Sequence, residues 1–338
     1  MKPLWTFLTP MPADALASAV RRAEDAGFAG VFFPQLHGAP FSMMAAAAVE
    51  SSRLGIGSGI ALAFSRSPVE TALAALEVDL LSGGRTVLGL GPGARVTNER
   101  IHGTPYGNPR RQLREVIEIV RDVIERGHGG ELGVYEGEYR RADLRGARLG
   151  GARPRSSIPI HLAALFEGSI RLAGEIADGL LGHPIWSLRW IENELEQNLH
   201  AGREKAAERR PSFTVNLWSY VTIDRDRRRA LDDARSTVAF YASRGQYQRY
   251  FDVHGFGAEA RAVAEAWARG DVAAAVAAVP DEMVDTFSTA GTPDEVRERI
   301  ERFSTLADVV TLVPPGLGGL LPAERVEGYR EAILRTFS

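Results

Sequence analysis

Residues 54–90, LGIGSGIALAFSRSPVETALAALEVDLLSGGRTVLGL, contain one complete strand–helix–strand unit. The apolar run Leu54–Leu62 predicts a strand, Pro68–Leu81 predicts a helix, and Thr86–Leu90 predicts the next strand. A Ser-Gly-Gly sequence ends the helix. Neither strand alternates cleanly between apolar and polar residues, which is typical of strands buried on both faces of a parallel sheet. The segment therefore predicts a βαβ unit with a right-handed crossover.

The same unit recurs along most of the chain. The predicted strands are Leu4–Leu8, Gly30–Phe33, Leu54–Leu62, Thr86–Leu90, Ile158–Ala163, Gly179–Leu181, Thr214–Ile223 and Ala307–Leu312. The main predicted helices are Ala13–Gly27, Ser42–Ser52, Pro68–Leu81, Pro109–Glu125, Gly168–Ile176, Trp186–Glu208, one that starts at Thr292, and Ala323–Phe337. This alternation favours a (β/α)8 TIM barrel over an open doubly wound sheet. We expect one domain over residues 1–338, with insertions near 127–156 (a hairpin around Leu132–Tyr139 and an exposed loop) and 226–286 (mostly helical).

Composition excludes several classes of function. The 338 residues include 40 basic and 43 acidic side chains, so the formal charge is −3, which argues against general binding to nucleic acid. There is no cysteine, which excludes disulfides and thiolate metal sites. No apolar run approaches the roughly 20 residues of a membrane helix, and Met1 leads at once into a strand-like run. We expect a soluble, cytoplasmic protein with a small-molecule substrate, and no nucleic-acid or membrane partner.

In a (β/α)8 barrel the site lies at the carboxyl ends of the strands. The third strand ends in Gly57–Ser58–Gly59–Ile60–Ala61, where glycine marks either a main-chain surface for a flat ring or tight barrel packing. The fourth ends in Gly89–Leu90–Gly91–Pro92–Gly93, which lacks the spacing and the acidic partner of a dinucleotide loop. After the fifth strand, Gly168 and Ser169 open a helix and offer amides and a hydroxyl to a phosphate, although plain capping by Ser169 is the alternative.

Histidines and arginines supply the remaining candidates. The seven histidines show no metal-ligand spacing, so no metal site is predicted. His37 and His183 fall at strand exits and are candidates for proton transfer, against the alternative of ordinary structural histidines. Arg66 is a candidate anion ligand, as are Arg95, Arg100, Arg110 and Arg111. The arginine-rich run 140–155 favours a solvated loop over a role in holding an acidic tail.

Several segments together resemble the luciferase-like monooxygenase superfamily, and specifically its deazaflavin branch. They are Phe28–Phe33 with Pro40–Phe41, Arg53–Ile60, Phe64–Pro68, Asp79–Arg85 running into Leu88–Gly91, Pro159–Ala164 and Leu172–Gly179. Their order and spacing match the family over nearly the whole chain.

This resemblance implies a (β/α)8 barrel that forms a homodimer through its early helices and binds a flavin-like ring at its mouth. It implies a non-prolyl cis peptide at Gly59–Ile60 behind the ring, and cofactor phosphate binding around Gly168 and Ser169. Two positions depart from the family. Residues 34–37 read PQLH where many relatives have Asp-His or Glu, so a carboxylate is replaced by Gln35. Residues 166–168 read FEG in place of a Gly-Pro-Lys-like turn.

On this basis we expect an oxidoreductase that transfers a hydride between coenzyme F420 and a small organic substrate. The resemblance assigns His37, Gln35 and His183 (with Tyr106 as an alternative proton carrier) to catalysis. It assigns the cofactor to Gly59, Ile60, Ala61, Arg66, Gly91, Gly93, Gly168 and Ser169. Phe41, Phe64 and Trp186 would wall the substrate pocket, and the helical insertion would form a lid.

Two alternatives remain open at this point. One is an FMN-dependent monooxygenase of the same superfamily, in which reduced flavin reacts with oxygen. The other is a non-catalytic barrel that binds flavin and reduces nothing.

Overall fold

The computed structural model describes residues 2–35, 38–207, 212–316 and 319–338, and the chain divides into two compact units. We call residues Pro3–Gly182 with Asn193–Asn216 the strand unit. We call residues His183–Glu192 with Leu217–Ser338, which also include Lys2, the helical unit. The expectation of a single domain over residues 1–338 stays a prediction.

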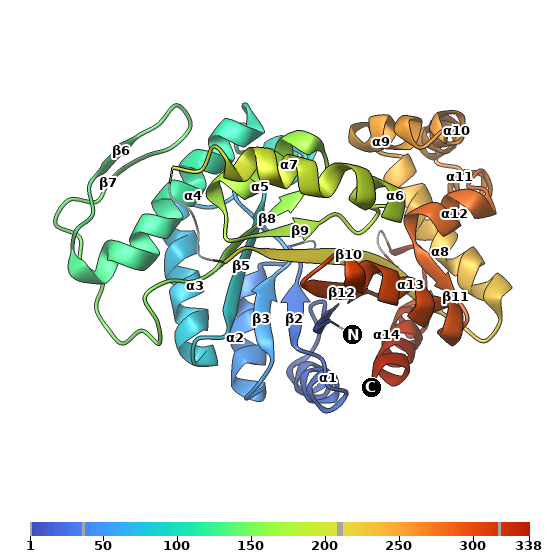
Figure 1. Cartoon of the computed structure of the whole chain (residues 1–338), viewed down its shortest axis with the longest axis horizontal. Coiled ribbons are helices and arrows are strands. Elements are labelled where there is room, and N and C mark those ends of the chain that lie inside the picture. The colour runs from blue at the N-terminus through green and yellow to red at the C-terminus, as the bar shows by residue number, and fades with distance from the viewer. Residues whose placement is uncertain (1, 36–37, 208–211, 317–318) are drawn as a thin grey trace. The chain divides into compact units, whose positions relative to one another are not determined.

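The strand unit carries the first six βα repeats (Figure 1). Its strands are β1 (Leu4–Phe7), β2 (Gly30–Phe33), β3 (Gly55–Ser58), β4 (Ala61–Leu62), β5 (Thr86–Gly91), β6 (Val134–Glu136), β7 (Arg141–Asp143), β8 (Ile160–Ala164), β9 (Gly179–Gly182) and the start of β10 (Thr214–Ile223). Its helices are α1 (Ala13–Asp25), α2 (Pro40–Glu50), α3 (Pro68–Ser82), η1 (Thr97–Ile101), α4 (Pro109–Arg126), η2 (Gly127–Gly129), α5 (Glu167–Ile176) and α7 (Glu196–Arg203).

The strands of this unit pair in parallel, in the order β1–β2–β3–β5–β8–β9–β10. Both faces are buried: Phe32, Ile56, Leu88 and Leu162 have no exposed surface. The predicted third strand is interrupted, because the chain leaves β3 at Ser58 and pairs again with β5 only from Ala61. The carboxyl ends of these strands therefore meet at one rim, and the interruption lies in that rim.

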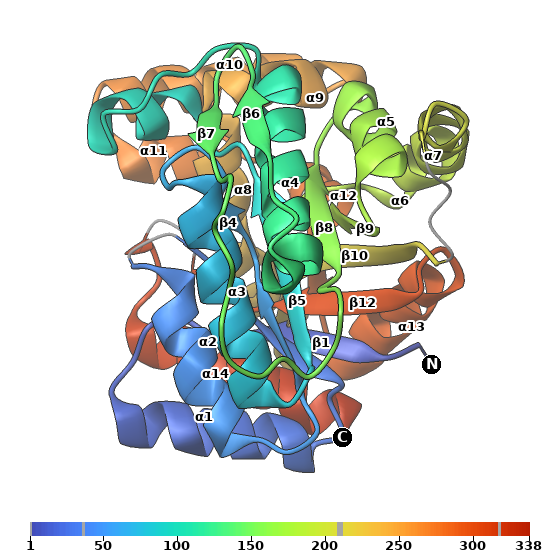
Figure 2. The ribbon, with the colours of Figure 1, turned by 90° about the vertical axis from the view of Figure 1, so that its left-hand side faces the viewer.

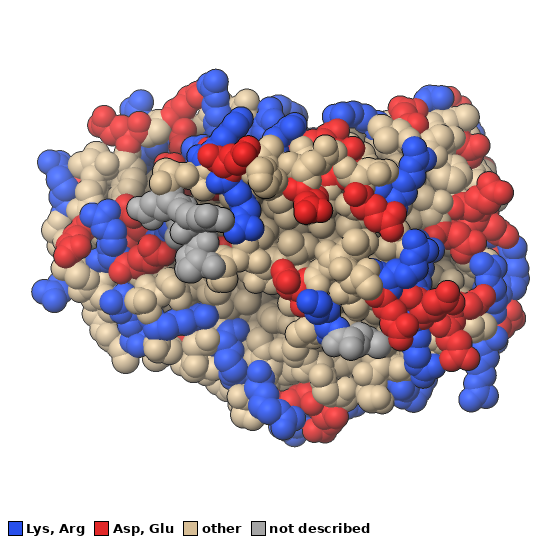
Figure 3. All heavy atoms as spheres, viewed as in Figure 1, with Lys and Arg blue, Asp and Glu red and all other residues tan. Residues whose placement is uncertain are grey.

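The hairpin β6–β7 lies along helix α4 (Figure 2). The Tyr135 hydroxyl donates to Asp122 at 2.6 Å, and Glu115 accepts amide hydrogens from residues 138, 139 and 140. Basic and acidic side chains are interspersed over this part of the surface (Figure 3). The predicted hairpin is present, although its second strand lies beyond Tyr139, and hydrogen bonds to α4 hold it in place.

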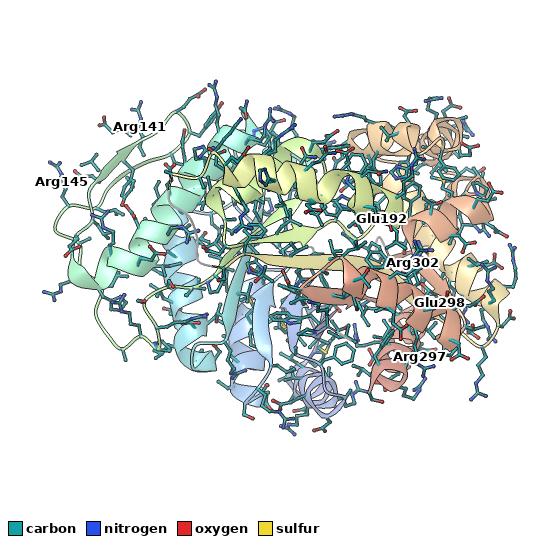
Figure 4. The ribbon with its side chains drawn as sticks, in the orientation of Figure 1. Arg141, Arg145, Glu192, Arg297, Glu298 and Arg302 are labelled. Carbon is teal, nitrogen blue, oxygen red and sulfur yellow. The ribbon has the colours of Figure 1, made fainter. Side chains whose placement is uncertain are left out.

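The arginine-rich run that begins at Arg140 is only partly solvated. Arg141 and Arg145 point away from α4 and are exposed (Figure 4). Arg140 instead donates to the Phe64 carbonyl oxygen at 2.9 Å. Arg155 pairs with the buried Asp79 at 2.6 Å. The expectation of a solvated loop is therefore wrong for Arg140 and Arg155, because each donates to an acceptor elsewhere in the strand unit and so holds the loop against it.

The helical unit contains the predicted insertion and the last repeats. Its elements are α6 (Leu188–Trp190), the rest of β10, α8 (Arg227–Ala242), η4 (Gly245–Tyr247), α9 (Gln248–Val253), α10 (Gly257–Ala268), α11 (Val272–Ala277), α12 (Asp281–Phe287), β11 (Thr289–Gly291), α13 (Pro293–Thr305), β12 (Val309–Val313) and α14 (Ala323–Phe337). β10 pairs in parallel with β11. The capping box predicted at the start of α13 is present, since Glu295 accepts from the amide of Thr292 at 2.8 Å.

One predicted helix differs in form. The region predicted as a single helix over 186–208 consists of α6, a π-helical turn η3 (Ile191–Leu195) and α7, which ends at Arg203. All eight predicted barrel strands are present, as β1, β2, β3 continued by β4, β5, β8, β9, β10 and β12, and helices follow them in the expected order. The (β/α)8 fold class is confirmed.

Candidate active site

The rim of the strand unit is centred on the break between β3 and β4, which we call the bulge (residues 59–60). The peptide bond between Gly59 and Ile60 is cis, at the position that the family resemblance implies. The Gly59 amide donates to the Phe33 carbonyl oxygen at 2.8 Å, and the Ile60 carbonyl oxygen accepts from the Gln35 amide at 3.1 Å. Two main-chain hydrogen bonds thus tie the bulge to the end of β2.

Glycines around the bulge make room for neighbouring groups. A Cβ on Gly91 would lie 2.2 Å from the Ile60 side chain, and one on Gly93 would lie 2.7 Å from the Leu62 side chain. A Cβ on Gly57 would lie 2.4 Å from the Phe32 ring. The contacts therefore favour the packing alternative for Gly57, and they give Gly91 and Gly93 a packing role as well.

Gln35 joins the bulge to the loop that follows it. Its Oε1 accepts from the Leu62 amide at 2.9 Å and from the Arg66 guanidinium at 3.0 Å. Its Nε2 donates to the Ser65 hydroxyl at 3.2 Å. The side chain is thus committed to positioning residues 62–66, and Arg66 in turn lies 5.4 Å from the centre of the Phe41 ring.

Phe64 and Tyr106 form an aromatic corner beside Gly93. Their rings meet edge to face at 5.5 Å, and the Tyr106 hydroxyl donates to the Gly93 carbonyl oxygen at 3.2 Å. Arg95 lies over the Tyr106 ring at 4.8 Å. Burial raises the pKa of Tyr106, against the opposing effect of Arg95. Tyr106 therefore stays protonated near neutral pH, and its proton is engaged by a main-chain oxygen.

The exit of β8 combines a helix N-terminus with a cation. A Cβ on Gly168 would lie 2.5 Å from the Arg110 guanidinium, so glycine at this position admits Arg110 to the start of α5. Among the described residues, the Gly168 amide has no acceptor. The Ser169 hydroxyl is fully used, because it accepts from the amides of Leu165 and Phe166 and donates to the Phe166 carbonyl oxygen. The capping alternative thus holds for the Ser169 hydroxyl, while Gly168 and Arg110 remain available to an anion.

His183 follows β9 and belongs to a cluster of aromatic side chains in the helical unit, which we call the tyrosine cluster (His183, Tyr220, Tyr241 and Tyr247). Its Nε2 lies 3.3 Å from the Tyr247 hydroxyl, and its ring lies 5.2 Å from the Tyr241 ring. The hydroxyls of Tyr220 and Tyr241 are 2.9 Å apart. Desolvation by burial lowers the pKa of His183 to about 3, so His183 is neutral at physiological pH.

The other predicted residues divide between interior and rim. Trp186 is 2% exposed and Phe64 is 1% exposed, so both are interior side chains, whereas Phe41 is half-buried. His37 lies outside the described residues. Among the residues that are described, no group of three or more His, Cys, Asp or Glu side chains could hold a metal ion.

Comparison with known proteins places the chain in a family. The model of the luciferase-like monooxygenase family matches residues 5–308. The chain belongs to this family, as the resemblance predicts. It is 34% identical over 309 residues to the 5,10-methylenetetrahydromethanopterin reductase of Archaeoglobus fulgidus, with 88% of each chain covered. It is 31% identical over 324 residues to a putative coenzyme F420-dependent oxidoreductase of Mycobacterium tuberculosis, with 90% of this chain and 92% of that protein covered.

Solved structures agree with this assignment. The coenzyme F420-dependent tetrahydromethanopterin reductase of Methanopyrus kandleri superposes with a TM-score of 0.83 at 26% identity, and the match covers 100% of this chain and 99% of that one. An F420-dependent secondary alcohol dehydrogenase superposes with a TM-score of 0.72 at 18% identity, over 92% and 93% of the two chains. This second likeness shows the fold alone.

No helix of the described residues is long and apolar enough to cross a membrane.

Proposed function

We propose that the protein is an F420-dependent oxidoreductase that transfers a hydride between coenzyme F420 and an electrophilic carbon of a small organic substrate. The observation that carries this proposal is the 34% identity to an archaeal reductase over 88% of both chains. The bound deazaflavin supplies the hydride chemistry, and the protein supplies orientation and exclusion of water.

The rim of the strand unit suits an anionic, ring-bearing cofactor. The bulge and Ala61 offer main chain behind one ring face, with Gln35 fixing residues 62–66 beside it. Gly168 and Arg110 offer an unpaired amide and a cation to a phosphate at the start of α5. In this assignment Gly91 and Gly93 act through Ile60 and Leu62, which pack on them, and Ser169 acts by capping α5.

Proton transfer is assigned among the remaining candidates. Gln35 has no proton of suitable acidity, so its role is positioning, and Tyr106 donates to the main chain. His183 is neutral and weakly basic, so at neutral pH it shares a hydrogen bond with Tyr247 and is neither a proton donor nor an effective proton acceptor. His37 keeps the role of proton carrier that the sequence predicts.

We also propose that the protein is a cytoplasmic homodimer that associates through its early helices. Three large apolar side chains on these helices are exposed to solvent. Val49 on α2 exposes 64% of its surface, and Leu80 and Leu81 on α3 expose 49% each. Light scattering of the purified protein should give twice the 36.7 kDa chain mass. A monomer at micromolar concentration would reject this part of the proposal.

A cofactor titration tests the main proposal. Purified protein titrated with coenzyme F420 should show a saturable change in cofactor fluorescence, and FMN should bind much more weakly. Arg110→Gln should weaken F420 binding about tenfold, because a charge-assisted contact to the phosphate is lost. Arg145→Gln is the matched control and should leave affinity within twofold, since it makes the same charge change on the exposed hairpin.

Two outcomes would overturn the assignment. Turnover with reduced FMN and oxygen, without F420 binding, would make the protein a flavin monooxygenase. Tight F420 binding without hydride exchange toward any carbonyl, imine or alcohol substrate would make it a non-catalytic carrier.

A further inference from the structure

Arg66 is a half-buried cation without a carboxylate partner. Among the described residues, no acidic side chain lies within ion-pairing distance of its guanidinium, whose one protein acceptor is the uncharged Oε1 of Gln35 at 3.0 Å. Glu70, in the first turn of α3, is exposed and acts on Arg66 only through longer-range attraction. Arg66 therefore keeps its net positive charge at the rim.

Two other arginines of the strand unit that are withdrawn from water pair with carboxylates, and two more, Arg85 and Arg140, donate to main-chain carbonyl oxygens. Arg121 pairs with Asp178 at 3.0 Å, and Arg155 pairs with Asp79 at 2.6 Å. Removing a cation from water without an anion is costly, so such pairing is the usual arrangement. Among the described residues, the Arg66 guanidinium has neither a carboxylate nor a main-chain carbonyl oxygen as an acceptor, so at the rim a ligand rather than the protein would supply the anion.

The surroundings of Arg66 also favour an anion. Arg66 precedes Ser67, the N-cap of α3, so the positive end of the helix dipole lies close to it in the chain. Phe41 covers the guanidinium at 5.4 Å and restricts its orientation. Gln35 cannot rotate away without giving up its bonds to Leu62 and Ser65. The guanidinium is thus pre-positioned, with donors left over after the bond to Gln35.

We propose that Arg66, held by the uncharged Gln35, is a second anion-binding group of this rim beside Gly168 and Arg110, and that its ligand is a planar oxygen anion of the carboxylate type. This proposal rests on the proposed function, because that function supplies the two sources of such an anion. One source is a carboxylate on the substrate, and the other is the negative charge delocalised over the pyrimidine end of the cofactor ring. A glutamate at position 35 would neutralise Arg66 from within the protein, so the uncharged glutamine leaves the positive charge available to a ligand.

Calorimetric titration of the full-length protein tests this assignment with three variants. Arg66→Gln removes the charge, Arg66→Lys keeps the charge but loses the planar fork, and Gln35→Glu keeps Arg66 but neutralises it. Arg145→Gln is the matched control, since it makes the same charge change on the exposed hairpin. The probes are oxidised and reduced coenzyme F420, benzoate as a carboxylate, and benzamide as its uncharged counterpart.

Either source gives a distinct pattern. If the substrate supplies the anion, Arg66→Gln and Gln35→Glu lower benzoate affinity about tenfold but leave benzamide and F420 unchanged. If the cofactor ring supplies it, the same two variants lower F420 affinity about tenfold and leave benzoate unchanged. In both cases Arg66→Lys loses less than Arg66→Gln, and the loss shrinks at high salt.

The proposal is overturned if wild-type protein binds F420 while Arg66→Gln and Gln35→Glu bind every probe within twofold of wild type. Failure of the proposed function looks different, since wild-type protein would then not bind F420 at all. Circular dichroism of each variant confirms that the comparison is made on folded protein.

Discussion

The rim around the bulge and the tyrosine cluster are built in opposite ways. At the rim, glycines and main-chain hydrogen bonds set the geometry, and the residues concerned fall in short segments at strand ends. In the tyrosine cluster, side chains from a strand exit, a strand, a helix and a 3-10 turn converge through ring contacts and hydroxyls. The rim tolerates few substitutions, so its residues form a recognisable motif in the sequence. The tyrosine cluster depends on tertiary packing, so its residues form no motif in the sequence.

The largest expected effect comes from filling a glycine contact in the strand unit. Gly89→Ala would place a Cβ 2.0 Å from the Ser58 carbonyl oxygen and 2.7 Å from the Leu181 side chain. Because the first neighbour is main chain, β3 and β5 must separate, and the free energy of unfolding should fall by about 3 kcal/mol or more. Urea unfolding followed by circular dichroism measures it.

Gly133→Ala is the matched control, because a Cβ at Gly133 has nothing within 4 Å. It should change the free energy of unfolding by less than about 0.5 kcal/mol. If Gly89→Ala proves equally harmless, the close approach of β3 to β5 does not determine the geometry of the rim.

A second prediction compares one buried histidine in each unit. Burial lowers the pKa of His161 in β8 to about 4, with Asp178 opposing the shift, and lowers the pKa of His183 to about 3. Both pKa values lie below the unfolded-state value, so each histidine's contribution to stability is complete above about pH 6.5 and is lost as the pH falls toward 4. When the pH is lowered from 7 to 5, the free energy of unfolding of the wild type should therefore fall by about 2 kcal/mol more than that of His161→Leu.

The measurement is urea unfolding at the two pH values, with histidine proton chemical shifts followed by NMR. Both His161 and His183 should remain neutral at pH 5. Titration of His183 near 6.5 would mean that the tyrosine cluster is open to water, and would remove the contrast between a dry cluster and a rim that takes a ligand.

The sequence predicted the elements better than the contacts. The eight strands and the helices between them could be predicted because each has a local apolar pattern in the sequence. The capping box at Thr292 is also a local sequence signal. The break at Gly59–Ile60 was located through family resemblance, since the apolar run continues across it. The single helix expected over 186–208 includes a π-helical turn, which periodicity alone does not distinguish.

Contacts between distant positions could not be predicted in this way. Gln35 and Arg66 are 31 positions apart, and their pairing depends on the path of the loop after β4. Tyr241 and Tyr247 lie in the helical insertion, where periodicity shows a buried face but not which element faces it. The sequence shows tyrosines in the insertion and a histidine at a strand exit, but it does not show that they contact each other, because 64 positions separate His183 from Tyr247.

The smallest expected effect concerns the hydroxyl pair of the tyrosine cluster. The hydroxyls of Tyr220 and Tyr241 are 2.9 Å apart, and both side chains are at least nine-tenths buried. Replacing either tyrosine by phenylalanine leaves the other hydroxyl without this partner, which should cost about 1 kcal/mol, whereas the double replacement should cost less than the sum by about 1 kcal/mol. A thermodynamic cycle by urea unfolding measures this coupling. A second cycle pairs Tyr241→Phe with Tyr135→Phe, whose hydroxyl bonds to Asp122 in the strand unit, and should be additive. Equal coupling in both cycles would show that the Tyr220–Tyr241 contact has no energetic role of its own, and that ring packing alone assembles the cluster.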